Sequence, residues 1–283
     1  MGNPALVARY RTRNAIIYLV LCIWIAFSLF SFLWILFTSF KSNAELYAGV
    51  WSLPKKLHIE NYLKAWNVTN LKRFFLNSLV VTFASIFLLT FICTPAAYVL
   101  SRFKFRGVGF LNNLFIAGMG IPAQLLLIPL YKLILGIRLN DNLAGLGLVY
   151  IALSIPFTTY LLSGFLRSLP SELEDSAMVD GCGEIATFWR IMFPLAQPGI
   201  VTAAIFNFLF LWNEYMIALV FIMKEQKRTI SLGLYSIQSA MLWTADWAGL
   251  FAAVVIVMLP TVLLYVLLSE KVMQGITLGA VKG

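Results

Sequence analysis

The feature that most constrains this chain is a series of long apolar runs separated by short polar segments. An α-helix needs about 20 mostly apolar residues to cross the hydrocarbon core of a bilayer. Runs of this length cover residues 15–40, 74–100, 110–135, 143–166, 199–223 and 247–268. Only 12% of the residues are charged and 61% are hydrophobic, whereas soluble domains carry about 25% charged residues. The sequence therefore predicts an all-α membrane protein with about six transmembrane helices, folded as one transmembrane domain over residues 1–283.

Prolines interrupt the third and fourth of these runs. Pro122 and Pro129 lie in the third run, and Pro156 lies in the fourth. A proline inside a helix leaves a backbone carbonyl without its N–H partner, which is tolerated in a membrane where neighbouring protein or water can satisfy it. We therefore expect these two helices to pack against protein rather than to face lipid on all sides.

The basic residues set the predicted orientation. Arg9, Arg11 and Arg13 precede the first run, whereas Lys41 alone follows it closely. Cytoplasmic segments beside membrane helices are enriched in Lys and Arg, so the N-terminus is predicted to be cytoplasmic. The short basic segment "SRFKFRG" at 101–107 agrees with this orientation. Six crossings then place both termini in the cytoplasm.

Several classes of function are disfavoured. The net charge is +9, but Lys and Arg stand singly between apolar runs and form no basic face, so no nucleic-acid partner is predicted. Cys22, Cys93 and Cys182 have neither CxxC spacing nor a nearby histidine pair, and we expect no metal site or disulfide. The phosphate-loop pattern GxxxxGK[ST] does not occur in the sequence, so this chain is not expected to hydrolyse ATP.

A polar, acid-rich segment lies between the fourth and fifth runs and reads "EDSAMVDGCGEIATFWRIMFPLAQPGI" over 174–200. Ser171 and Glu174 have the spacing of a capping box, which predicts that a short helix starts there. Asp180 and Gly181 then predict a turn, because glycine adopts turn conformations at little steric cost.

A second, amphipathic helix is predicted to follow this turn. Apolar residues recur at helical spacing from Glu184 onward, and polar residues fall on the opposite side. The apolar face would hold Ile185, Phe188, Trp189 and Met192, and the polar face Glu184, Thr187 and Arg190. Pro194 and Pro198 are expected to end this helix before the fifth run.

The wording of this segment resembles the cytoplasmic "EAA" loop of ATP-binding-cassette (ABC) importer permeases, whose pattern runs approximately E-A-A-x-x-D-G-A and then I-x-x-P-x-x-x-P. Further segments resemble the sugar-importing branch, of the maltose-permease type. They are "FFLNSLVVTFASIF", "AAYVLSRFKFRG", "LLLIPLY", "FLWNEYMIAL" and the terminal "GITLGAVKG". The loop departs from the family wording because Asp175, Ser176 and Ala177 stand where E-A-A is expected, and Cys182 stands where alanine is common.

The resemblance implies a type I importer permease fold, in which the loop at about 170–198 couples the permease to an ATPase subunit. The residues that it assigns to coupling are Glu174, Asp175, Ser176, Ala177, Asp180, Gly181, Phe188 and Pro194. Either Glu174 or Asp175 could make the main acidic contact.

The resemblance also implies partners. These are a second permease subunit, two ABC ATPase subunits that bind ATP and Mg, and a solute-binding protein that delivers a mono- or oligosaccharide. This chain itself would carry no cofactor and would lie among the lipids of a bacterial inner membrane as a multi-pass subunit.

Polar residues inside the apolar runs are candidates for the solute path. Glu214 and Asn213 lie in the fifth run, and Gln124 stands beside Pro122 in the third. Ionisable groups are costly in lipid, so they mark either function or bonding between helices, and both alternatives stay open. The rival classes are an ion-coupled secondary transporter and a membrane-embedded enzyme. The first would need internal repeats and the second a cluster of catalytic side chains, and neither stands out in the sequence.

Overall fold

The computed structural model describes the backbone of residues 4–67 and 69–280, and the side chains of residues 14–67, 69–240 and 243–268. Every regular element within these ranges is a helix. By contacts, the chain forms two compact units, one of residues 1–69 with 237–256 and one of residues 70–236 with 257–283. The basic side chains at 9, 11 and 13 and the last three residues of "GITLGAVKG" lie outside the described parts.

Candidate membrane spans match the predicted runs in number. Within the described residues, four helices are long and apolar enough to cross a bilayer alone, and two bent pairs pass the same test, which gives up to six spans. The single helices cover Asn14–Ser39, Leu71–Arg102, Leu143–Ser168 and Trp247–Leu268. The predicted all-α membrane architecture is therefore confirmed.

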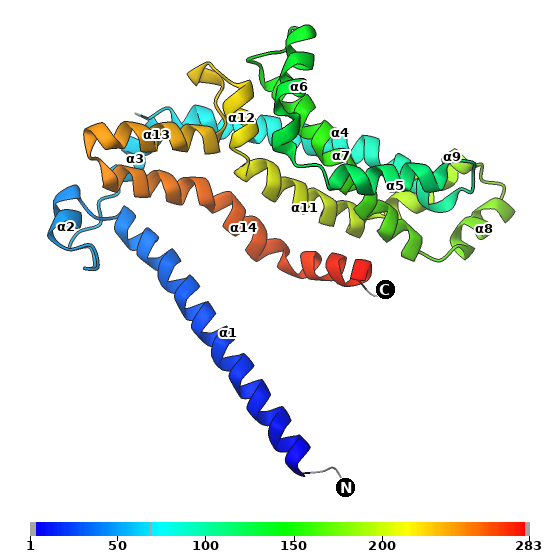
Figure 1. The fold of residues 1–283 in the computed structure, drawn as a ribbon, viewed down its shortest axis with the longest axis horizontal. Coiled ribbons are helices and arrows are strands. Elements are labelled where there is room, and N and C mark those ends of the chain that lie inside the picture. The colour runs from blue at the N-terminus through cyan, green and yellow to red at the C-terminus, as the bar shows by residue number, and fades with distance from the viewer. Residues whose placement is uncertain (1–3, 68, 281–283) are drawn as a thin grey trace. The chain divides into compact units, whose positions relative to one another are not determined.

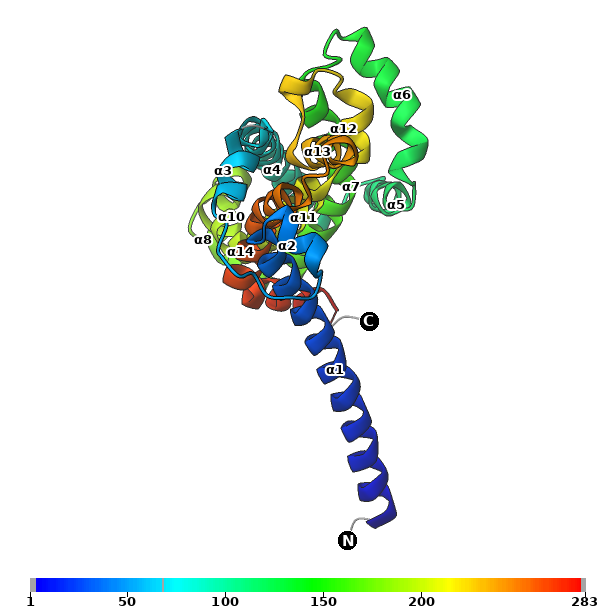
Figure 2. The ribbon, with the colours of Figure 1, turned by 90° about the vertical axis from the view of Figure 1, so that its left-hand side faces the viewer.

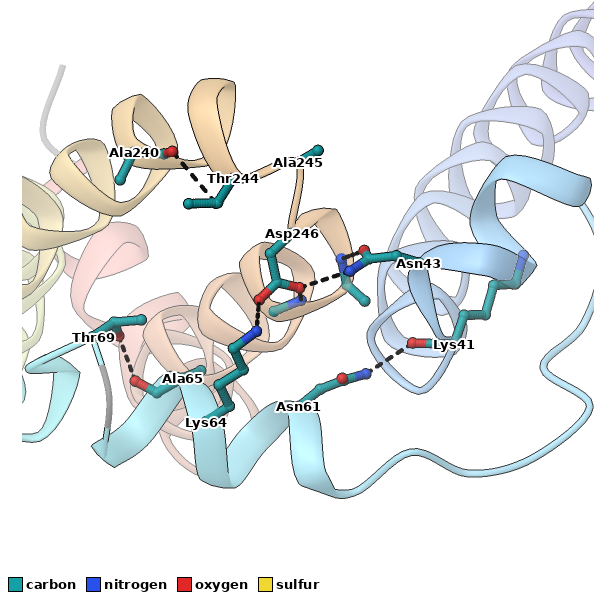
Figure 3. Close-up of polar contacts among 12 residues, drawn as sticks. Lys41, Asn43, Asn61, Lys64, Ala65, Thr69, Ala240, Thr244, Ala245 and Asp246 are labelled. Atoms are coloured by element: carbon teal, nitrogen blue, oxygen red, sulfur yellow. Dashed lines mark hydrogen bonds and ion pairs between the residues drawn. The ribbon is translucent and has the colours of Figure 1, made fainter.

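The first unit contains α1 (Pro4–Ser39), α2 (Asn43–Ala48), α3 (Glu60–Asn67), the end of α13 (Ile230–Thr244) and the start of α14 (Trp247–Ala280). The apolar side chains of α1 are mostly exposed, as expected for a helix whose neighbours are lipids. Polar contacts hold the segment after it. Lys41 is buried and donates to the carbonyls of Gly49 and Val50. Asp246 joins Asn43 to Lys64 (Figure 3).

The second unit is built on α4 (Leu71–Arg102) and α7 (Leu143–Ser168), which pack along each other, with α11 (Gln197–Asn213) against both (Figure 1). Small and β-branched residues line this contact, for example Ser85 opposite Gly147. Half of the most apolar window of α7 is buried, although the helix contains Pro156. The expectation that this proline-containing helix packs against protein is confirmed.

The third run is not one straight span. It forms α5 (Val108–Met119) and α6 (Ala123–Gly136), which meet at 103° (Figure 2). Pro122 precedes α6 and has no N–H to continue the hydrogen-bond ladder of α5, so the chain turns there. The packing expected of this run is found only in part, because no residue of α5 is fully buried and only Ile134 is buried in α6.

The fifth run is also broken, contrary to the prediction of one continuous helix. Its main helix α11 ends at Asn213, and a short helix α12 (Met216–Phe221) follows after Glu214. The physical reason is local, because the side chain of Glu214 accepts the first free N–H groups of α12 and so favours a new helix start. Beyond α12 a single 3₁₀ turn (Glu225–Lys227) leads to α13.

Candidate functional site

The polar segment after α7 starts with the helix α8 (Glu172–Val179), close to where the sequence predicted it. The capping box expected at its start does not form. The Ser171 side chain makes no cap hydrogen bond, and instead its carbonyl accepts from the backbone N–H groups of Glu174 (3.0 Å) and Asp175 (3.2 Å). The Glu174 side chain contacts Arg102 instead of the start of α8.

Glu174 forms an ion pair with Arg102, which lies in the last turn of α4. Arg102 Nε is 3.3 Å from Glu174 Oε2, and Arg102 Nη2 donates a 2.7 Å hydrogen bond to the carbonyl of Leu169. Only 12% of the Arg102 side chain and 16% of the Glu174 side chain are exposed. Arg102 was predicted only to mark the orientation, and its contact with Glu174 was not predicted, because no local sequence pattern links the two residues.

The other predicted residues of α8 take separate positions. Asp175 and Asp180 are exposed, and Ser176 Oγ donates to the carbonyl of Glu172 at 2.7 Å. Ala177 is buried, which makes it the one fully buried residue of α8. The structure therefore distinguishes the two acids that the sequence left equivalent, because Glu174 is largely buried beside Arg102 whereas Asp175 is exposed.

Gly181 makes the predicted turn. Its φ of +76° lies in the left-handed region, which glycine adopts without a steric penalty. A Cβ atom at this position would have no neighbour within 4 Å, so conformation rather than space requires glycine here. The turn is closed by hydrogen bonds from the N–H of Gly181 to Met178 and from the N–H of Cys182 to Ala177.

The second helix of the segment differs from the prediction. It starts at Glu184 as α9 (Glu184–Thr187), but it continues as a π-helical turn (Phe188–Met192) and then α10 (Phe193–Leu195). In the π turn the N–H of Phe193 bonds to the carbonyl of Phe188, five residues earlier. A π turn adds one residue to the helical repeat and so shifts the faces.

The predicted faces are therefore wrong in part. Phe188 and Met192 are buried as expected, but Ile185 is 78% exposed and Thr187, assigned to the polar face, is buried. The Phe188 ring lies 5.0 Å from that of Tyr98 in α4. Pro194 is exposed in the first turn of α10, and the axis bends by 66° before α11.

A cavity of about 270 Å³ lies between the end of α4 and the two short helices. It is lined by Tyr98, Arg102, Phe103, Ser171, Glu174, Asp175, Met178, Glu184 and Thr187. The hydroxyl of Thr187 is buried and has no hydrogen-bond partner in the described structure. The contact between α8 and α4 is therefore loosely packed and polar.

Glu214 is buried and its side chain accepts three hydrogen bonds. Its side chain accepts from the N–H groups of Ile217 (2.6 Å) and Ala218 (3.0 Å) and from the hydroxyl of Tyr150 (2.8 Å). Of the two alternatives left open by the sequence, this geometry favours the structural one, because the carboxyl group caps α12 and bonds it to α7.

Asn213 and Gln124 do not join Glu214 in one site. Asn213 is exposed and donates to the carbonyl of Leu209 in its own helix at 2.8 Å. Gln124 is exposed in the first turn of α6, and neither residue lines the apolar cavity beside α7 and α11.

That cavity, of about 500 Å³, lies among α5, α6, α7 and α11 and is mostly apolar. Its buried polar groups are Ser154, whose hydroxyl has no hydrogen-bond partner, and Asn207, which donates to Thr158 Oγ1 at 2.9 Å. Sequence analysis missed Asn207, although the rule that selected Asn213 applies equally to a second amide in the same run.

No metal or disulfide site is built from the described side chains. No group of three His, Cys, Asp or Glu side chains in these ranges could hold a metal ion. Cys22, Cys93 and Cys182 are free thiols. Cys93 is buried in the core between α4 and α7, where it acts as a small apolar packing residue.

Comparisons with known proteins agree with one another. Residues 93–276 match the model of the family described as binding-protein-dependent transport system inner membrane component. The chain is 33% identical to the diacetylchitobiose uptake system permease protein NgcG of Streptomyces coelicolor, over 94% of this chain and 88% of the relative. It is 35% identical to the sulfoquinovosyl glycerol transport system permease protein SmoH of Agrobacterium fabrum, over 90% and 89%.

A solved structure shares the fold. It is a chain from the crystal structure of a bacterial ABC transporter involved in the import of the acidic polysaccharide alginate. The two folds superimpose with a TM-score of 0.80, covering 92% of this chain and 96% of the other, at 21% sequence identity.

Proposed function

We propose that this chain, which belongs to the family of inner membrane components of binding-protein-dependent transport systems, is a permease subunit of an ATP-driven sugar importer. Two relatives that are about one-third identical to this chain are named as permease proteins for diacetylchitobiose uptake and for sulfoquinovosyl glycerol transport. Their names support a sugar as the transported solute. In this role residues 1–283 act as one transmembrane domain in a bacterial inner membrane, with both termini in the cytoplasm.

The coupling role is supported by a group of exposed residues on the two short helices and the turn between them, here called the docking surface. It consists of Asp175, Met178, Val179, Asp180 and Ile185. Val179 is 88% exposed, Ile185 78% and Met178 58%, and the two acids are exposed beside them. Apolar side chains that protrude from a short loop, with charges around them, are typical of a contact with another protein. We propose that this surface docks on a partner ATPase subunit.

The proposed mechanism uses the rigid connections of the segment. The loop joins α7 and α11, two helices packed in the core of the second unit, so a displacement of α8 and α9 is passed to both. When the two ATPase subunits bind ATP and Mg they close, and the loops of this chain and of a second permease move together. ATP favours one arrangement only if the closed ATPase pair binds it more tightly than the other.

The solute-binding protein delivers the sugar from the outer side, and the chain itself hydrolyses nothing. The rival class, an ion-coupled transporter, would use Glu214 as its coupling group. The three hydrogen bonds that hold this side chain favour a fixed structural part instead.

Co-purification tests the proposal. The chain is expressed with its genomic neighbours and purified from membranes, either as wild type or with Asp175→Lys. A second exposed acid, Glu60, lies between the first two spans and pairs with His58 of the same segment, and Glu60→Lys is the control. We expect an ATPase subunit to co-purify with wild type and with the control, and to fall by at least about tenfold with Asp175→Lys, because a reversed charge at a docked acid costs several kcal/mol.

Two outcomes would contradict the proposal. The family role in this complex is wrong if no ATPase subunit is found with the wild-type chain. The docking surface is wrong if Asp175→Lys retains the ATPase as well as Glu60→Lys does.

A further inference from the structure

We propose that Arg102 is a positioning residue for coupling, which ties the docking helix α8 to the C-terminal end of α4. A displacement of α8 by the ATPase subunit would then move α4 as well as α7 and α11. This inference rests on the proposed function, and it adds a third core helix to the path by which the loop acts.

The contacts of Arg102 fit this role because they reach two neighbouring points of the loop. Its Nη2 holds the carbonyl of Leu169, where α7 ends, and its Nε faces the carboxylate of Glu174 in the first turn of α8. A guanidinium group carries its charge and its donors in one rigid plane, so Arg102 can hold the Leu169 carbonyl by a hydrogen bond and the Glu174 carboxylate by charge. Both side chains of the ion pair are largely buried, where such a pair is screened little by salt.

The two halves of the loop are attached to α4 in different ways. The second half is fixed by apolar packing, because Phe188 and Met192 are buried in the core cluster that also contains Tyr98. By contrast α8 buries only Ala177, and it packs mainly against α9 and the π turn. Glu174 therefore fastens α8 directly to α4, through its ion pair with Arg102 and through the Tyr98 hydroxyl as a second partner on the same helix.

The cavity beside the ion pair explains why a polar contact is needed between α4 and α8. A cavity of about 270 Å³ lies between the end of α4 and the helices α8 and α9, so apolar packing between these elements is incomplete. Without Arg102, α8 could tilt into or away from this space while the core below remains packed. Loss of Arg102 should then uncouple the elements rather than unfold them.

The same geometry gives the two acids, Glu174 and Asp175, different functions. Glu174 is used inside the chain by Arg102, and Asp175, one residue further on, is exposed in the docking surface. Neutralising Glu174 should therefore weaken coupling but not docking, whereas changing Asp175 should weaken docking.

The functional test uses the whole complex in proteoliposomes, with its ATPase subunits and binding protein. The variants are Arg102→Ala, Arg102→Lys and Glu174→Gln, and the control is Arg106→Ala, which removes an exposed arginine from the same short segment. We expect Arg102→Ala and Glu174→Gln to keep the ATPase subunits bound and to lower sugar transport per ATP hydrolysed by about tenfold, within the usual range of coupling factors. Arg102→Lys should lose less, because it keeps the charge.

A distance measurement separates coupling from a merely structural role. Spin labels are placed at Lys104, just beyond α4, and at Glu172 in α8, both exposed and outside the docking surface, after Cys22, Cys93 and Cys182 have been replaced by alanine. In wild type the distance between the labels should stay the same with and without ATP, because α4 and α8 move together. In Arg102→Ala, and in Glu174→Gln, it should broaden and change with ATP.

The inference is overturned if Arg102→Ala transports as well per ATP as Arg106→Ala, or if the label distance in the Arg102 and Glu174 variants matches wild type in both nucleotide states. Should Arg102→Ala fail to fold, Glu174→Gln decides the question, since it keeps the shape of the side chain. Failure of the proposed function would appear differently, as a wild-type complex that neither binds an ATPase subunit nor transports sugar.

Discussion

The hydroxyl of Tyr150 donates a 2.8 Å hydrogen bond to the side chain of Glu214, and both residues are buried where the fifth apolar run breaks. Glu214 also accepts from two backbone N–H groups at the start of α12. A polar side chain in the middle of an apolar run thus supplies the hydrogen bonds that a broken helix leaves free, and Tyr150 attaches that break to α7.

Tyr150→Phe is predicted to destabilise the chain. It leaves the shape of the core intact but removes one donor from a buried carboxyl group, and leaving a buried acceptor without its partner costs about 1–3 kcal/mol. Thermal unfolding of the purified chain in detergent measures the loss. Tyr160→Phe, the same change at an exposed site of the same helix, should have little effect, and equal unfolding temperatures for the two variants would contradict the structural role.

Gly181→Ala is predicted to weaken docking through the backbone alone. An L-residue in the left-handed region costs about 1–2 kcal/mol, and no atom lies close enough to a new Cβ to add a clash. Gly183 has an ordinary φ of −74° and equally open surroundings, so Gly183→Ala is the matched control. The measurement is the amount of ATPase subunit that co-purifies, and a loss with Gly183→Ala but not with Gly181→Ala would refute the turn assignment.

Gly199→Ala is predicted to disturb the packing of α11 on α7. A Cβ at Gly199 would lie 2.5 Å from the Phe165 ring, closer than real contacts allow, whereas one at Gly164 would meet nothing within 4 Å. Overpacking costs about 1–3 kcal/mol, while an open helical site gains up to about 1 kcal/mol from Gly→Ala. Unfolding temperatures of the two alanine variants should therefore move in opposite directions, and a shared direction would show that the ring simply moves aside.

The six apolar runs were predictable because hydropathy depends on composition, and composition does not change when a helix bends. The bends themselves were not predicted. Pro122 was noted as a break in hydrogen bonding, yet a proline can kink a span or turn it through 103°, and the neighbouring packing decides which. At Glu214 the polar signal was visible, but its capping of α12 depends on a helix start that apolar periodicity does not mark.

The candidate site was predicted in outline and missed in its contacts. The helix, the glycine turn and the second helix follow from local patterns. The π turn at Phe188–Met192 does not, since one added residue is invisible to a count at 3.6 residues per turn. The pairing of Arg102 with Glu174 joins the ends of two different helices, so no local pattern could have assigned Glu174 to the interior and Asp175 to the surface.

The pH dependence of the first unit is predicted to centre on Asp246. This carboxyl group accepts from Lys64, from Asn43 Nδ2 at 3.0 Å and from the N–H of Gly249 at 3.2 Å (Figure 3). Burial by itself raises the pKa of Asp246, but these hydrogen bonds outweigh it and hold the pKa below its ordinary value. A carboxyl group whose pKa is lowered by folding stabilises the fold above its unfolded pKa, near about 4, and loses that effect as the pH falls through the folded value.

Asp246→Asn should therefore lower the unfolding temperature at pH 7, because the ammonium of Lys64 loses its charged partner, and it should flatten the fall in stability below about pH 4. Asp180→Asn, which changes an exposed acid, is the control. Unfolding temperatures of the three proteins between neutral and acidic pH provide the measurement. If wild type and Asp246→Asn lose stability in parallel as the solution is acidified, the contacts of Asp246 do not govern the acid response of this unit.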